Sequence, residues 1–197
     1  MTGVQTCALP IFNPNLTCDR CEYCRIGEHS LCLRYGILGE HLPGGMAELV
    51  SVRGDRVLAL PDAISYEDAA SFVLTNMTAW RMVMTQGQLR AGQDVLVLGV
   101  GGGVSSTAVQ IAKLAGARVF VTSSSDAKLE RARELGADVG INYTKEDWAK
   151  AVFDKTGRRG VDLVIENVGA STWKQSVRSL RKGGRLVTCG ATTGPIG

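Results

Sequence analysis

The sequence has neither a long apolar run nor a cluster of charges of one sign. No apolar stretch approaches the ~20 residues that a membrane-spanning helix needs, so we expect no membrane segment. Residues 8–12 are apolar but too few for a signal peptide, and no basic residues precede them. The 22 Lys and Arg and 19 Asp and Glu are interspersed. Without a basic stripe, we expect no nucleic-acid partner.

Four of the six cysteines lie close together in the sequence, and no export signal accompanies them. This combination favours reduced thiols in the cytoplasm over a disulfide-linked secreted domain. We therefore expect a cytoplasmic protein.

The first dozen residues differ in character from the rest. Residues 2–11 resemble the conceptual translation of a sequencing-adapter oligonucleotide, and they have no helix or strand period. We therefore predict that residues 1–12, Cys7 included, are a non-native segment outside the fold. Native sequence would begin at about Asn13, which would make the chain an internal fragment.

Residues 13–62 are rich in turn signals such as Asn13-Pro14 and Pro43-Gly44-Gly45. Two short strands are expected in this part, at 46–52 and 56–60. Ser65 has the character of a helix N-cap before an acidic first turn. The helix that it begins is expected to reach about residue 85, with an interruption near Thr75-Asn76.

After Gly92 the chain alternates regularly between apolar strands and helices. Unbroken apolar strands of this kind are buried on both faces of a parallel sheet. We therefore predict an α/β fold with a doubly wound parallel sheet, at residues 63–197, whose sixth strand would follow Gly197. The expected strands are 94–99, 118–122, 139–143, 161–167 and 184–190, and the expected helices are 103–114, 126–135, 146–156 and 171–180.

Cys18, Cys21, Cys24 and Cys32 have the spacing C-x2-C-x2-C-x7-C. Closely spaced cysteines on a looping backbone suit tetrahedral zinc, and metal binding would stabilise a lobe with little core. A disulfide pair would close a small strained ring. An iron–sulfur cluster is the other alternative, but its distinctive Cys-Pro is missing. We predict structural zinc on these four cysteines and place His29 at the surface.

The cysteine lobe, followed by Gly44-Gly45-Met46-Ala47-Glu48 and a glycine-rich doubly wound domain, resembles the medium-chain dehydrogenase/reductase superfamily. Within it, the chain resembles the zinc-type alcohol dehydrogenases and the quinone oxidoreductases. The resemblance covers residues 13–197. It implies that 13–62 are part of a GroES-like β domain, that the lobe's zinc is structural, and that 63–197 bind a nicotinamide dinucleotide.

Glycines 99, 101, 102 and 103 lie where the first strand of the sheet becomes a helix. They would let the backbone approach a pyrophosphate at the positive end of that helix. The family pattern would place a glycine at 105, where this chain has Ser105. The resemblance implies cofactor contacts at Thr78, Gly99, Gly102, Gly103, Val104, Asn167, Val168, Gly169 and Gly190.

The tip of the second strand sets the cofactor preference. An NAD site usually has an acidic residue there, whereas this chain has Ser123 and Ser124. Lys128 follows in the next helix, and Tyr143 matches a tyrosine of the quinone reductases that contacts the 2′-phosphate. Asp126 would be the ribose acid if the strand ran longer, but it is better explained as a helix N-cap. Together these residues favour NADP(H) over NAD(H).

The alcohol dehydrogenases of this superfamily hold a second, catalytic zinc. The matching stretch here, Val73-Leu74-Thr75-Asn76-Met77, has no Cys, His or carboxylate and is interpreted as a packed apolar turn. We therefore expect an NADP(H)-dependent oxidoreductase that transfers hydride to a carbonyl or an activated alkene, quinone-like or enone-like. No residue present is assigned as catalytic.

Two other functions remain open, a zinc-dependent alcohol dehydrogenase and a non-catalytic module that binds nucleotide or zinc. The fragment by itself is expected to have no turnover. The full-length protein is expected to be a homo-oligomer that acts on small molecules.

Overall fold

The computed structural model describes residues 10–194, which fall in two compact units divided between Leu74 and Thr75. The boundary lies inside the long helix α2, Tyr66–Trp80. Within residues 10–194, every helix is too short or too polar to span a lipid bilayer.

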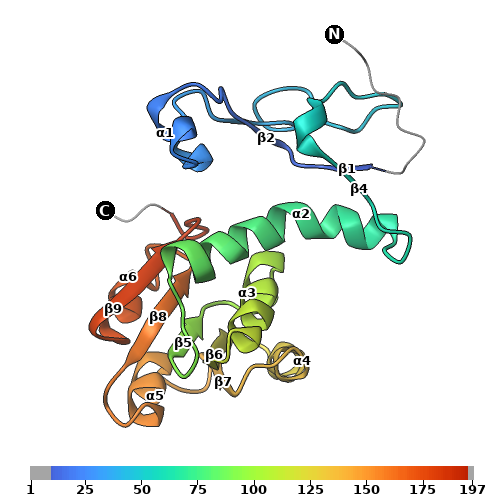
Figure 1. Ribbon diagram of the computed structural model, residues 1–197. Helices are drawn as coiled ribbons and strands as arrows, with labels where there is room; N and C mark the ends of the chain where they lie inside the picture. Colours follow the sequence, from blue (N-terminus) through green and yellow to red (C-terminus); the bar gives the residue numbers. More distant parts are fainter. Residues whose placement is uncertain (1–9, 195–197) are drawn as a thin grey trace. The chain divides into compact units, whose positions relative to one another are not determined.

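The first unit consists of short elements joined by long loops (Figure 1). Strand β1 pairs antiparallel with β4, and β2 pairs antiparallel with β3. Two 3-10 turns, His29–Leu31 and Gly54–Arg56, complete it. The bounds of the other elements are β1 Pro10–Phe12, β2 Asn15–Leu16, α1 Glu22–Arg25, β3 Gly36–Ile37 and β4 Val57–Ala59.

Residues 10–12, at the end of the segment that was predicted to lie outside the fold, form strand β1. Ile11 pairs with Leu58 and Phe12 with Val57 in the β1–β4 ladder. Residues 10–12 thus form a strand although the sequence shows no strand period there, because three residues are too few to show one. That residues 1–12 are non-native stays a prediction. Cys7 lies outside the described residues.

The expected strand at 46–52 is absent, and these residues are loop. Met46 is 105% exposed and Leu49 is 90% exposed, so nothing buries the apolar side chains that suggested a strand. A strand also needs a partner for its backbone N–H and C=O groups, and no ladder of the described residues includes this stretch.

Helix α2 begins after Ser65, whose Oγ accepts a hydrogen bond from the Asp68 N–H at 3.1 Å. The expected interruption at Thr75-Asn76 does not occur. Thr107 Oγ1 of α3 donates to Asn76 Oδ1 at 3.0 Å, which gives this polar residue a partner inside the helix packing. The helix instead widens into a π-helical segment, Arg81–Gln86.

The second unit contains the predicted five-stranded parallel sheet, in the order β7-β6-β5-β8-β9. The order runs outward in one direction from β5 to β7 and in the other from β8 to β9. Ligands of such sheets bind at the carboxyl ends of the strands where the direction reverses, here between β5 and β8. The strands are β5 Asp94–Val97, β6 Arg118–Ser123, β7 Val139–Asn142, β8 Val161–Glu166 and β9 Leu180–Thr188.

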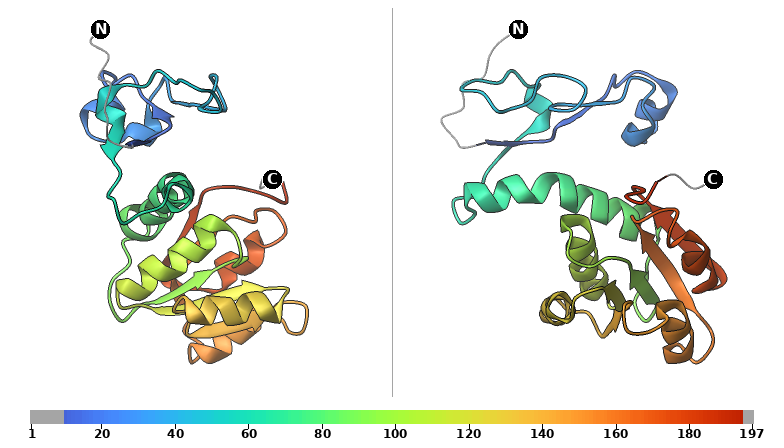
Figure 2. Two further views of the ribbon diagram at one scale, coloured as in Figure 1. Left: turned by 90° about the vertical axis from the view of Figure 1, so that its right-hand side faces the viewer. Right: turned by 180° about the vertical axis from the view of Figure 1, so that it is seen from behind.

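Helices cover both faces of the sheet (Figure 2). Apolar side chains of α3 and α4, such as Val109 and Leu129, pack on one face with Val95 and Val119. On the other face, α5 contributes Val152, and α6 contacts α5. The doubly wound fold is thus confirmed, with helices α3 Gly103–Leu114, α4 Asp126–Glu134, α5 Trp148–Lys155 and α6 Trp173–Arg178.

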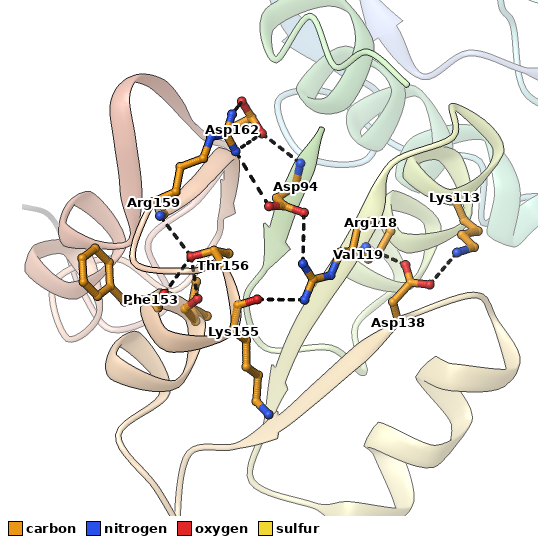
Figure 3. A network of polar contacts seen from close by, with 12 residues as sticks. Asp94, Lys113, Arg118, Val119, Asp138, Phe153, Lys155, Thr156, Arg159 and Asp162 are labelled. Carbon is orange, nitrogen blue, oxygen red and sulfur yellow. Dashed lines mark hydrogen bonds and ion pairs between the residues drawn. The ribbon is translucent and has the colours of Figure 1, made fainter. Parts of the chain in front are cut away.

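The amino ends of the strands are joined by ion pairs (Figure 3). Asp162 of β8 accepts hydrogen bonds from Arg159 Nη2 at 2.7 Å and Arg181 Nε at 2.5 Å. It also accepts the Asp94 N–H of β5 at 2.9 Å. Burial by itself would raise the pKa of Asp162, but hydrogen bonds from the two arginines outweigh it and lower the pKa to about 2. This network therefore ties β5, β8 and β9 together at the edge of the sheet opposite the carboxyl ends of the strands.

Candidate functional site

The four cysteines predicted to bind metal converge in the first unit. Their sulfur atoms all lie within 4.8 Å of one another. Four thiolates about 2.3 Å from a tetrahedral zinc would be about 3.8 Å apart, so the cluster fits one ion after a small contraction. The sulfurs are free thiols rather than disulfides, and His29 is exposed and outside the cluster.

Backbone N–H groups around the cluster favour negative charge on sulfur. Hydrogen bonds from the backbone of Cys24 and Leu33 lower the pKa of the Cys21 thiol to about 6. The Cys18 N–H donates to Cys32 Sγ at 3.3 Å. Burial raises the pKa of the Cys24 thiol to about 12, a cost that a bound cation would offset. Groups that hydrogen-bond to the ligand atoms in this way help to orient the ligands of a metal site.

The glycine loop after β5 adopts conformations that only glycine takes easily. Gly99 has φ +61° and Gly101 has φ +141°. Gly102 is the extended residue before α3, which begins at Gly103. A Cβ atom on Gly103 would lie 2.7 Å from Thr75 Cγ2, so a glycine is needed for the contact between α3 and α2. Gly101, Gly102 and Gly103 are exposed, so the N-terminus of α3 is accessible to an anion such as a pyrophosphate.

Ser105, in the first turn of α3 after Val104, replaces the glycine of the family pattern and is buried. Its Oγ donates to the Leu98 carbonyl at 3.2 Å and accepts a hydrogen bond from Asn167 Nδ2 at 3.0 Å. The serine thus joins the ends of β5 and β8 across the point where the sheet order reverses. A glycine would make neither bond.

Hydroxyl groups occupy the tip of β6. Ser123 is buried, and its Oγ accepts the Ser125 N–H at 3.2 Å, while Ser124 is exposed. Ser125 is the N-cap of α4, because its Oγ accepts the Lys128 N–H and its backbone is extended. The sequence assignment of Asp126 as the N-cap was therefore wrong by one residue.

Asp126 has other partners. Its carboxylate accepts hydrogen bonds from Asn142 Nδ2 at 2.8 Å and Lys145 Nζ at 2.5 Å. The Asn142 and Lys145 bonds lower the pKa of Asp126. The Asp126 carboxylate, which follows the tip of β6, is thus hydrogen-bonded to Asn142 and paired with the Lys145 cation.

Lys128 lies across the glycine loop. A Cβ atom on Gly101 would be 3.0 Å from Lys128 Cδ and 3.5 Å from its Nζ. Lys128, Arg131 and Gly101 line a hollow of about 410 Å³. None of the described residues that line it is acidic, so this surface attracts anions.

A larger cleft of about 770 Å³ opens at the carboxyl ends of β5, β6 and β8. Gly99, Tyr143, Lys145 and Val168 are among its lining residues. Tyr143 is half exposed, and its N–H donates to the Ser123 carbonyl at 3.1 Å. The cleft therefore brings the glycine loop, the β6 tip and the turn after β8 to one surface of the sheet.

The turn after β8 is organised by a residue that the sequence analysis missed. Glu166 Oε1 accepts the N–H groups of Val168 at 2.6 Å and Gly169 at 3.1 Å. Its Oε2 accepts the hydroxyls of Thr172 at 2.9 Å and Ser176 at 2.5 Å. A carboxylate at the carboxyl end of a buried strand, directly before the turn that was predicted to contact the cofactor, is the signal that would have identified it.

The loops that follow β8 and β9 are joined to each other. The Thr193 N–H donates to the Val168 carbonyl at 2.8 Å. Gly169 has φ +95°, and a Cβ atom there would lie 2.7 Å from the Gly194 carbonyl oxygen. Gly190 is exposed just beyond β9. These residues form one continuous wall beside the crevice.

Thr78 is a half-buried residue of α2, and no described lining residue of the two clefts belongs to that helix. Residues 73–77 are helical, which corrects the expected apolar turn. Leu74 is half exposed. The stretch still offers no side chain that binds zinc.

Two family models match the chain. "Alcohol dehydrogenase GroES-like domain" matches residues 6–62, and "Zinc-binding dehydrogenase" matches residues 103–196. The first match begins before the predicted start of native sequence, at about Asn13. The chain belongs to the medium-chain dehydrogenase/reductase superfamily.

Relatives in this superfamily include both an alcohol dehydrogenase and a quinone oxidoreductase. An alcohol dehydrogenase of Geobacillus stearothermophilus is 34% identical over 174 residues, which are 88% of this chain and 50% of that protein. A quinone oxidoreductase of Salmonella typhimurium is 31% identical over 175 residues, 89% of this chain and 52% of that protein. This medium-chain dehydrogenase/reductase chain thus spans about half the length of these relatives.

Solved structures of the superfamily have the same fold. An NAD-dependent alcohol dehydrogenase has a TM-score of 0.91 at 45% identity, covering 96% of this chain and 55% of that one. A zinc-binding dehydrogenase from Sinorhizobium meliloti, bound to NADP, has a TM-score of 0.86 at 29% identity. It covers 100% of this chain and 58% of that one.

Proposed function

We propose that the whole protein is an NADP(H)-dependent oxidoreductase that transfers hydride between the nicotinamide and a carbonyl or an activated alkene. The observation that carries this proposal is Lys128 lying across Gly101, beside a β6 tip that presents hydroxyls. A quinone or enone is the proposed type of substrate. Small molecules, rather than nucleic acids or membranes, are its proposed partners.

Each group at the β6 tip has a role in this proposal. Ser124 is exposed and donates a hydrogen bond to the 2′-phosphate, and Lys128 supplies a charge-assisted one. Tyr143 adds a hydroxyl at the edge of the larger cleft. Lys145 forms an ion pair with Asp126, and this pair reduces the repulsion between the Asp126 carboxylate and the phosphate.

The remaining site residues position the cofactor. The N–H groups at the start of α3 hold the pyrophosphate, and the turn from Asn167 to Gly169 lines the crevice where the nicotinamide half lies. The bound dinucleotide supplies the hydride chemistry, while the protein orients it and excludes water. No residue of this chain is proposed as an acid, base or nucleophile.

Zinc has a structural role in this proposal, held by Cys18, Cys21, Cys24 and Cys32. The convergence of the four sulfurs supports it, as does the lack of an extended core around them. The free thiols of the described cysteines are consistent with the proposed cytoplasmic location. A homo-oligomer is proposed for the full-length protein.

A zinc-dependent alcohol dehydrogenase is the second candidate. The 45% identical structure, an NAD-dependent alcohol dehydrogenase by name, favours an alcohol dehydrogenase activity. Leu74 and its neighbours on α2 count against it, because none can bind a catalytic zinc. Elemental analysis of the full-length protein separates the two candidates. One zinc per chain supports the reductase, and two support the alcohol dehydrogenase.

The cofactor proposal is tested by titrating the chain with NADPH and NADH while following nicotinamide fluorescence. We expect Lys128→Met to weaken NADPH binding roughly tenfold, about 1.4 kcal/mol, and to leave NADH binding nearly unchanged. Lys182→Met is the matched control, because Lys182 is exposed at the opposite edge of the sheet. Equal effects of Lys128→Met on both cofactors would reject a 2′-phosphate contact.

A further inference from the structure

Glu166 is a carboxylate in the interior of the second unit, and none of the cationic side chains in residues 10–194 pairs with it. Its exposed surface is 0%, and its four hydrogen bonds come from neutral groups, two backbone N–H groups and two hydroxyls. Among the described residues, no ion pair includes it. Four donors directed at two oxygens suit an ionised carboxylate. Such a buried charge is costly and is normally paired.

Asp162, the other carboxylate of β8, is paired with cations. Asp162, at the amino end of β8, contacts both Arg159 and Arg181. Glu166, at the carboxyl end, has no arginine or lysine partner in the part of the chain that the structure describes. Since both side chains are buried in one strand, the contrast is specific to the end that forms the crevice.

Glu166 also fixes the geometry of that end. Its Oε1 holds the N–H groups of Val168 and Gly169, so the turn cannot open without breaking both bonds. Asn167, inside the same turn, bonds to Ser105 across the point of reversal. A dinucleotide in this crevice would lie against a turn that is rigid and next to an uncompensated negative charge.

We propose that Glu166 is a positioning residue whose charge raises the affinity of the site for the oxidised cofactor relative to the reduced one. The inference rests on the proposed function, which places a nicotinamide dinucleotide in this crevice. Oxidised and reduced forms carry the same phosphates and differ by one positive charge on the nicotinamide ring. A fixed negative charge in a region of low dielectric therefore distinguishes the two.

Cys189 is a second titratable group close to Glu166. Cys189, in the loop after β9, has its thiol pKa raised by burial and by the negative charge of Glu166. The Cys189 N–H also donates to the Glu166 carbonyl at 3.3 Å. Glu166 and Cys189 therefore lie next to each other at the carboxyl ends of β8 and β9.

The test compares dissociation constants of NADP⁺ and NADPH for the 197-residue chain by isothermal titration calorimetry. Glu166→Gln removes the charge, while its amide oxygen can still accept the two N–H groups and its NH2 can donate to the hydroxyls. We expect the ratio of the NADP⁺ to the NADPH dissociation constant to rise about threefold or more. Glu166→Met is a second neutral variant of similar length, expected to raise the ratio in the same direction.

Ser176→Ala is the matched control, because it removes one donor to Glu166 and keeps the charge. It should weaken both forms equally and leave the ratio unchanged. An unchanged ratio in both neutral variants overturns the inference and leaves the proposed function intact. Failure of the wild-type chain to bind either form rejects the proposed function, and this inference with it. If thermal unfolding shows that neither neutral variant folds, Glu166 is a structural group only and the inference is rejected.

Discussion

Asn167 Nδ2 donates a hydrogen bond to Ser105 Oγ at 3.0 Å, and this contact joins residues that are 62 positions apart in the chain. Ser105 in turn donates to the Leu98 carbonyl beyond β5. The pair connects the carboxyl ends of β5 and β8, where the cofactor is proposed to bind. A position that the family fills with glycine for close packing is used here for a polar clamp.

We expect Ser105→Ala to lower the free energy of unfolding by about 1 to 2 kcal/mol, because the Asn167 amide loses a partner in a mostly buried setting. Thermal or urea unfolding measures the change. Ser106→Ala is the control, since Ser106 Oγ bonds only to carbonyls of its own turn. A Ser105→Ala protein as stable as the control would show that the clamp contributes nothing.

Asp162→Asn tests the ion-pair network at the amino ends of the strands. The folded-state pKa of about 2 lies below the ordinary value of 3.8, so the charge stabilises the fold at pH values above the ordinary pKa. That stabilisation is lost as the pH falls through the folded-state pKa. We expect Asp162→Asn to cost about 2 kcal/mol at pH 7, and the difference from wild type to shrink between about pH 4 and pH 2. A pH-independent difference in urea unfolding would contradict this origin.

Cys21→Ser tests the metal site. Elemental analysis of the wild-type chain should find one zinc per chain, and the variant should lose it, because three thiolates hold zinc less tightly than four. Hydrogen exchange should then increase in residues 13–40, with the second unit protected as before. Cys189→Ser, which alters a thiol outside the cluster, should retain the metal. Iron in place of zinc, or no metal in protein purified without chelator, would reject the assignment.

Lys145→Met tests whether a cation shields Asp126. Without Lys145 the Asp126 carboxylate keeps only its Asn142 partner and repels a nearby phosphate more strongly. Both side chains are exposed, so the expected loss of NADPH affinity is modest, roughly threefold. Fluorescence titration at low salt measures it, with Lys150→Met on α5 as the control. No loss, or an equal loss for NADH, would show that the pair does not affect cofactor choice.

The sequence predicted the second unit well because its signals are local. Apolar strands such as 94–97 and amphipathic helices such as 103–114 carry their own period, and both were located within a few residues. The strand expected at 46–52 failed because nothing packs against Met46 and Leu49, which is a tertiary property.

The site shows the same division. The four cysteines and the glycine loop were identified from spacing, which is visible in the sequence. The Ser105–Asn167 bond, the Asp126–Lys145 pair and the environment of Glu166 depend on contacts between distant segments. No local pattern contains them. An acidic residue at the carboxyl end of a buried strand, such as Glu166, nevertheless indicates a position where such contacts can be expected.

The dissociation constants of NADPH and NADH, measured for the wild-type chain and for Ser123→Asp, test the central claim most directly. Ser123 ends β6, where a carboxylate would repel a 2′-phosphate and accept bonds from the free ribose hydroxyls of NADH. The account predicts that wild type prefers NADPH and that Ser123→Asp loses roughly tenfold or more in NADPH affinity, about 1.4 kcal/mol, and reverses the preference. Equal wild-type affinities for the two cofactors, or a ratio that Ser123→Asp leaves unchanged in a folded protein, would contradict it.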